Sequence, residues 1–78
     1  MNAFQQLREA IAATLDIPPE MVRETTTQKD LAKWDSLAHV NLMVALESTF
    51  DLMLEVEDFE KLTSVPAILE HLKRHGIE

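Results

Sequence analysis

The fold is decided by residues 34–50, which read WDSLAHVNLMVALESTF. Apolar residues recur there at the three- and four-residue spacing of an α-helix, and neither proline nor glycine interrupts them. Asp35 and Ser36 are typical of a helix start, because short polar side chains accept hydrogen bonds from the first turn. The pattern predicts a helix from Ser36 to about Asp51. Its core face carries His39, Leu42, Met43, Leu46 and Phe50.

The same helix has a second apolar face, nearly opposite the first. Leu37, Val40 and Val44 form this outer strip, and Asn41 and Ser48 lie beside it. A helix packed on one side of a small bundle should be polar on its outer side. Two explanations remain open at this point. Either a long loop covers the strip, or the strip is a surface on which a partner docks.

Ser36 also has two interpretations. An Asp-Ser pair at a helix start is most often a cap, and Asp-Ser-Leu alone is a weak motif. Ser36 is alternatively an attachment point, with its hydroxyl held at the surface where another enzyme modifies it. The two interpretations are compatible, because Asp35 can cap the helix while Ser36 points outward.

Catalysis by Ser36, His39 and Asp35 is rejected. All three lie within one helical turn, so they cannot act as nucleophile, base and orienting group in line. His39 lies on the core face, where we expect a buried histidine with its hydrogen bonds satisfied. His71 and His75 share a helix face, but without a third ligand we expect a solvated pair and no metal site.

The rest of the chain also reads as helical. Phe4, Leu7, Ile11 and Leu15 predict a first helix that Ile17-Pro18-Pro19 ends. A long loop follows, from about Glu20 to Trp34, and we expect Met21, Val22 and Leu31 to tuck inward. Residues 55–62 predict a short helix. Ser64 is the expected N-cap of a last helix, which Gly76 ends. The predicted fold is all-α: a small four-helix bundle, three main helices plus one short one, in a single domain, residues 1–78.

Composition limits the partners. The 78 residues include 7 Lys+Arg and 14 Asp+Glu, for a formal charge of −7. This balance argues against nucleic acid and anionic membranes as partners, and it favours proteins with basic patches. Without cysteine the chain has no thiol of its own. The first residues lack a secretory pattern, so a cytoplasmic location is expected. We also expect the chain to be a monomer.

Several segments together resemble the acyl carrier protein family over nearly the whole chain. They are Leu15-Asp16-Ile17-Pro18-Pro19-Glu20, Asp30-Leu31, Trp34-Asp35-Ser36-Leu37, Leu46-Glu47-Ser48-Thr49-Phe50 and Phe59-Glu60-Lys61-Leu62-Thr63-Ser64-Val65. The resemblance implies a carrier rather than an enzyme. A separate phosphopantetheinyl transferase would move a 4′-phosphopantetheine arm from coenzyme A to Ser36, with Asp35 supporting the helix start.

The resemblance also implies a set of partners. The arm would hold acyl or aminoacyl cargo as a thioester for enzymes that load and process it. Basic patches on those enzymes would contact a docking surface of Leu37, Val40, Asn41, Val44, Glu47 and Asp58.

Three positions depart from the pattern of housekeeping fatty-acid carriers. Trp34 replaces a glycine, and Ala38 and Asn41 stand where acids are usual. We therefore favour a dedicated carrier for polyketide, specialised acyl or aminoacyl biosynthesis. The alternatives are a housekeeping fatty-acid carrier, or an unmodified helical interaction module that kept the fold and lost the arm.

Overall fold

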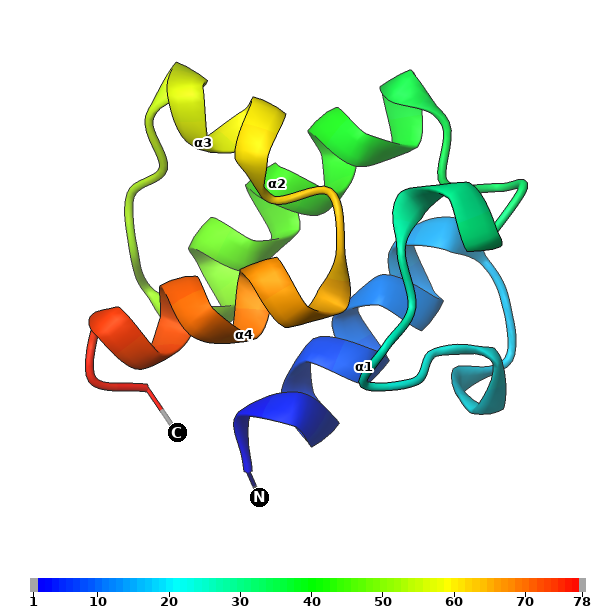
Figure 1. The fold of residues 1–78 in the computed structure, drawn as a ribbon, viewed down its shortest axis with the longest axis horizontal. Coiled ribbons are helices and arrows are strands. Elements are labelled where there is room, and N and C mark those ends of the chain that lie inside the picture. The colour runs from blue at the N-terminus through cyan, green and yellow to red at the C-terminus, as the bar shows by residue number, and fades with distance from the viewer. Residues whose placement is uncertain (1, 78) are drawn as a thin grey trace.

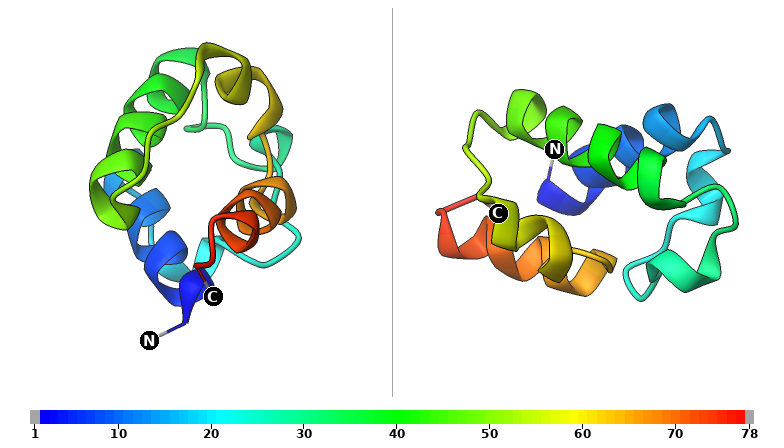
Figure 2. Two further views of the ribbon diagram at one scale, coloured as in Figure 1. Left: turned by 90° about the vertical axis from the view of Figure 1, so that its left-hand side faces the viewer. Right: turned by 90° about the horizontal axis from the view of Figure 1, so that it is seen from above.

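A computed structural model describes residues 2–77 and shows four α-helices (Figure 1). They are α1 (Ala3–Leu15), α2 (Ser36–Phe50), α3 (Val56–Lys61) and α4 (Val65–Arg74). The described residues include no β-strand, and the prediction of three main helices plus a short one is confirmed. α1 packs mainly against α2, and the four helices surround the space that the core side chains fill (Figure 2). Among these helices none is long and apolar enough to cross a membrane.

The ends of the helices follow local chemistry. Asn2 caps α1 by accepting the N–H of Gln5, and Ser64 caps α4 by accepting that of Ala67. α1 and α2 each end where an aspartate, Asp16 or Asp51, takes the left-handed conformation, with φ of 56° and 52°. Gly76 ends α4 as predicted, at a φ of 77° that glycine adopts without steric cost.

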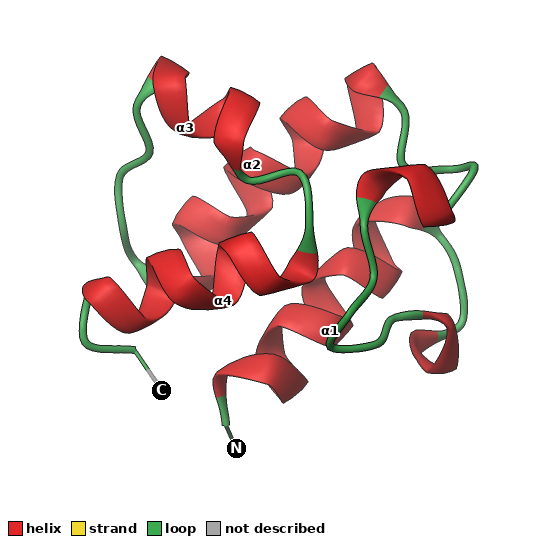
Figure 3. Ribbon diagram, in the orientation of Figure 1, coloured by secondary structure: helices red, strands yellow, loops and turns green. Residues whose placement is uncertain are grey.

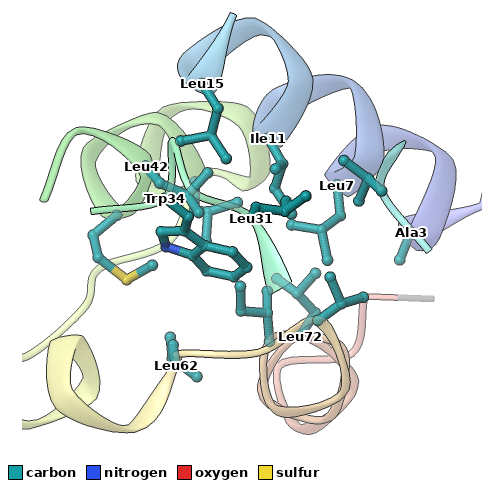
Figure 4. Packing of buried hydrophobic residues seen from close by; sticks show 14 residues of the cluster. Ala3, Leu7, Ile11, Leu15, Leu31, Trp34, Leu42, Leu62 and Leu72 are labelled. Carbon is teal, nitrogen blue, oxygen red and sulfur yellow. The ribbon is translucent and has the colours of Figure 1, made fainter. Parts of the chain in front are cut away.

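The core is one cluster drawn from every main helix and from the long loop. Trp34 is its largest side chain, and Figure 4 shows the indole among the labelled residues of the cluster. His39, Leu42, Met43 and Leu46 are buried as the periodicity predicts, while Phe50 is only half-buried against the cluster. The other buried members are Ala3, Leu7, Ile11, Leu15, Val22, Leu31, Leu62, Val65, Ile68 and Leu72.

The connection between α1 and α2 is the longest of the chain (Figure 3). It contains two 3₁₀ turns that the sequence did not predict, Pro19–Met21 and Gln28–Asp30. Val22 and Leu31 are buried as expected. The expectation for Met21 is wrong, since it is 49% exposed. Met21 ends a turn, whereas Val22 is extended, so the two neighbouring side chains point in different directions.

The long loop is fixed to the start of α4. The N–H of Val65 donates to the carbonyl of Thr26 at 2.8 Å, and the N–H of Gln28 donates to that of Thr63 at 2.9 Å. Between these bonds, Thr27 and Ser64 form an isolated antiparallel bridge. The segment that leads to Ser36 is therefore held by backbone hydrogen bonds to the last third of the chain.

Candidate functional site

Ser36 is the first residue of α2, and its side chain is exposed. Asp35 has an extended backbone and caps the helix, accepting the N–H of Ala38 on Oδ1 at 2.8 Å. The Ser36 hydroxyl takes part in no hydrogen bond among residues 2–77. The expectation that Asp35 caps the helix while Ser36 faces outward is confirmed.

The start of α2 suits a phosphate group. The cap serves only the N–H of Ala38, and His39 donates its own N–H to the carbonyl of Asp35 at 2.8 Å. Across the described residues the N–H groups of Ser36 and Leu37 have no acceptor, as is usual in a first turn. Free N–H groups and the positive end of the helix dipole favour an anion here. A phosphodiester on Ser36 Oγ therefore fits this position.

His39 is buried in the first turns of α2 and has both ring nitrogens bonded. The indole Nε1–H of Trp34 donates to its Nδ1 at 2.9 Å, and its Nε2 lies 2.6 Å from the carbonyl oxygen of Phe59. The ring is 7% exposed, so the expectation of a satisfied buried histidine is confirmed. Since the carboxylate of Asp35 bonds to Ala38 and not to the imidazole, Asp35, Ser36 and His39 do not form a catalytic triad.

Sequence reasoning missed the role of Trp34. The tryptophan was noted only as a replacement for glycine, yet it is 2% exposed and is the partner of His39. A histidine on the core face of a helix needs a polar partner. Trp34 carries an indole N–H and stands five residues before His39. This short separation was the available signal that Trp34 could be the partner of His39.

The outer strip is exposed along its length. Leu37 is 72% exposed, Val40 46% and Val44 56%, and Asn41 and Ser48 beside them are exposed too. The explanation that the long loop covers the strip is wrong. Three aliphatic side chains thus remain in contact with water on one face of α2, beginning directly beside Ser36.

The two acids expected to dock partners each have a contact within the chain. Glu47 accepts the N–H of Leu54 on Oε2 at 2.9 Å, and Asp58 accepts the N–H of Glu55 on Oδ2 at 2.9 Å. Both side chains are only half-buried, so their docking role stays a prediction. Four further acids in this region are exposed: Asp51, Glu55, Glu57 and Glu60.

The histidines of α4 differ from the expected solvated pair. The rings of His71 and His75 lie 4.7 Å apart, but His71 is half-buried and its Nε2 has no partner within the described residues. His71 lines a cavity together with Asp58 and Lys61 of α3. The periodicity of α4 alone could not show this, because the cavity depends on how α3 packs beside α4. No group of three or more His, Asp or Glu within residues 2–77 is placed to hold a metal ion.

Comparisons with known proteins match nearly the whole chain to one family and to named relatives. Residues 5–72 match the family described as "Phosphopantetheine attachment site". The chain is 32% identical over 76 residues to a protein of Bdellovibrio bacteriovorus named "Acyl carrier protein", covering 97% of each chain. It is 30% identical over 77 residues to one of the same name from Campylobacter concisus, covering 97% of this chain and 99% of that one.

Proposed function

We propose that this chain, which belongs to the acyl carrier protein family, carries its 4′-phosphopantetheine on Ser36 and serves a dedicated biosynthetic system. Members of the family are carriers rather than enzymes, and they hold the arm covalently on a serine. The resemblance inferred from the sequence is therefore confirmed. The observation that supports Ser36 is its exposed, unbonded hydroxyl at the first position of α2.

The other serines suit the role less well. The chain has serines only at positions 36, 48 and 64. The hydroxyl of Ser64 caps α4, bonded to the N–H of Ala67 at 3.1 Å. Ser48 is exposed but lies late in α2, away from the free N–H groups of the first turn. A phosphate on Ser36 would be next to those groups.

Modification transfers the 4′-phosphopantetheinyl group of coenzyme A. The Oγ of Ser36 forms a bond to the phosphorus that bears pantetheine, the phosphoanhydride bond of coenzyme A breaks, 3′,5′-ADP leaves, and the serine proton passes to a base of the transferase. When bound, the arm supplies the thiol that this cysteine-free chain lacks, and this thiol holds the cargo as a thioester. The start of α2 then stabilises the new phosphodiester through its N–H groups and dipole.

The outer strip supports docking of the transferase and of the biosynthetic enzymes. Leu37, Val40 and Val44 offer an apolar contact beside the attachment point. The exposed acids Asp51, Glu55, Glu57 and Glu60 follow at the far end of α2 and on α3. A partner with an apolar socket and a basic rim would complement this face in both shape and charge.

A dedicated role is favoured by the residues around the strip. Ala38 and Asn41 are uncharged, and α2 contains no acid between Ser36 and Leu46. We infer partners that recognise an apolar contact on α2 beside the arm and negative charge on α3 and at the end of α2. Such partners would be acyl, polyketide or aminoacyl enzymes of one pathway rather than the general fatty-acid synthase. An unmodified interaction module is disfavoured by the intact, accessible Ser36.

The test is an intact-mass measurement after incubation with coenzyme A and a broad-specificity phosphopantetheinyl transferase. The parent chain and Ser48→Ala should each gain one phosphopantetheine, and Ser36→Ala should gain none. Ser48→Ala is the matched control, because it removes an exposed hydroxyl from the same helix. If the folded parent stays unmodified while a control carrier is modified, the attachment proposal is wrong and the unmodified module becomes the better reading.

A further inference from the structure

We propose that Trp34 and His39 are positioning residues for the modification of Ser36. This inference rests on the proposed attachment to Ser36 and adds a specific claim to it. The two buried side chains form a clamp, defined as the Trp34–His39 hydrogen bond together with the bond from His39 to α3. The clamp holds the attachment segment in the conformation that the transferase accepts.

The hydrogen bonds determine the state of His39. An indole N–H is only a donor, so Nδ1 of His39 must accept the bond from Trp34 and carries no proton. The proton of the neutral ring is therefore on Nε2, which donates to the carbonyl oxygen of Phe59 at 2.6 Å. Only the neutral Nε2–H tautomer satisfies both contacts.

The clamp brackets Ser36 in the sequence. Trp34 precedes the serine by two residues and His39 follows it by three, so the bond between their side chains closes a short loop around it. Within that loop Asp35 caps the first turn. Trp34 is 2% exposed and His39 is 7% exposed. These two buried side chains anchor both ends of an otherwise exposed segment in the core.

The clamp also joins three parts of the fold. Trp34 belongs to the long loop, where its N–H donates to the carbonyl of Leu31 at 3.0 Å. His39 is in the first turns of α2, and Phe59 is in α3. The imidazole of His39 therefore accepts the bond from Trp34 and also holds α3 beside the first turns of α2 through the carbonyl of Phe59.

A preorganised segment speeds a reaction that must place one hydroxyl accurately. A partner enzyme that meets Ser36 already ordered does not have to order it on binding. Without the clamp, Asp35 and Ser36 would be held by the helix cap and by backbone hydrogen bonds, with no side-chain bond joining the residues on either side of them. The clamp therefore contributes to transferase efficiency beyond its contribution to folding.

The first measurement detects the clamp directly. The chain has a single tryptophan, so its indole N–H resonance is unambiguous in a ¹⁵N-labelled sample. We expect a scalar coupling between Nε1 of Trp34 and Nδ1 of His39, slow exchange of the indole proton, and ¹⁵N shifts of the Nε2–H tautomer. Absence of the coupling, with the indole proton exchanging freely, would overturn the proposal.

The second measurement links the clamp to the reaction. Trp34→Phe keeps an aromatic ring but removes the donor and leaves Nδ1 of His39 without a partner. We expect kcat/KM of the transferase for the carrier to fall roughly five- to tenfold, which corresponds to losing one buried hydrogen bond. Ile68→Val in the buried face of α4 is the control, because it also shortens a buried core side chain but lies far along the chain from Ser36.

A shape-matched replacement separates the hydrogen bond from the packing. Because Trp34 is the only tryptophan, its global replacement by β-(benzothienyl)alanine changes the indole N–H to sulfur and little else. It should lower kcat/KM as Trp34→Phe does, while 7-azatryptophan, which keeps the N–H, should restore it. Equal kcat/KM for Trp34→Phe and Ile68→Val would overturn the positioning role while leaving Ser36 as the attachment site. Failure of the parent to be modified would instead overturn both proposals.

Discussion

Glu47, in the last turns of α2, accepts the backbone N–H of Leu54 at 2.9 Å, so the helix is hydrogen-bonded to the connection that leads into α3. Leu54 is half-buried against the core. The same carboxylate therefore has a role in the fold of the α2–α3 connection as well as a predicted role in docking.

Glu47→Ala should lower the free energy of unfolding by about 1 kcal/mol, because the N–H of Leu54 loses its acceptor. Glu47→Gln keeps an oxygen acceptor and should lower it less. Urea denaturation measures both, with the exposed Glu57→Ala as the control. Amide hydrogen exchange at Leu54 should speed up in the alanine variant alone. Equal stability of Glu47→Ala and Glu57→Ala would show that the contact has no energetic role.

Asp35→Ala should also destabilise the chain, by about 1 kcal/mol, since the first turn of α2 loses the acceptor for Ala38. Asp35→Asn should lie close to the parent in thermal unfolding, because asparagine is an equally good N-cap. Transferase kcat/KM should fall in the alanine variant and stay near the parent value in the asparagine variant. A loss in both variants would mean that the charge of Asp35, rather than the cap, matters to the transferase.

Val40→Glu should impair partner use with little effect on the fold. The side chain is 46% exposed, so the free energy of unfolding should change by less than about 1 kcal/mol. Binding to a biosynthetic partner should weaken at least about tenfold, because a charge enters an apolar contact without a partner. Gln5→Glu, which adds the same charge at an exposed position of α1 outside the docking surface, is the control and should bind nearly as well as the parent. A large loss of thermal stability in Val40→Glu would show that Val40 belongs to the core.

Partner association should depend strongly on salt. The chain carries a formal charge of −7, and the exposed acids cluster at the end of α2 and on α3. Raising the ionic strength beyond about 0.15 M, where the screening length is about 8 Å, should slow association with little change in dissociation. Stopped-flow kinetics at several salt concentrations measures this. Replacing Glu55, Glu57 and Glu60 by glutamine should flatten the dependence, and an unchanged slope would show that these acids do not face the partner.

The helices and the cap at the start of α2 could be predicted because their signals are local. Periodicity placed α2, and the Asp35–Ser36 pair indicated both the cap and the outward hydroxyl. The second apolar face was visible in the same helical wheel. Whether a loop covered it depended on tertiary structure, and the exposed Leu37 and Val44 answered that question.

The contacts that the sequence did not reveal join residues through the folded core. The clamp needs α3 to bring the carbonyl of Phe59 to His39, and no local pattern encodes that approach. Glu47 appeared as a free docking acid because its acceptor role depends on how the chain turns after Asp51. Met21 was misplaced because a 3₁₀ turn changes which of two adjacent apolar residues faces inward.

On the proposed attachment at Ser36, the bridge between Thr27 and Ser64 has a consequence for when the chain can be modified during its synthesis. The loop ahead of Ser36 is fixed by Thr63 and Val65, which the ribosome adds well after the serine. A nascent chain that has just released α2 lacks those partners, and it also lacks Phe59 for His39. Ser36 therefore reaches its final setting only once α4 has emerged, so that chains cut short before residue 64 would be poor acceptors of the arm.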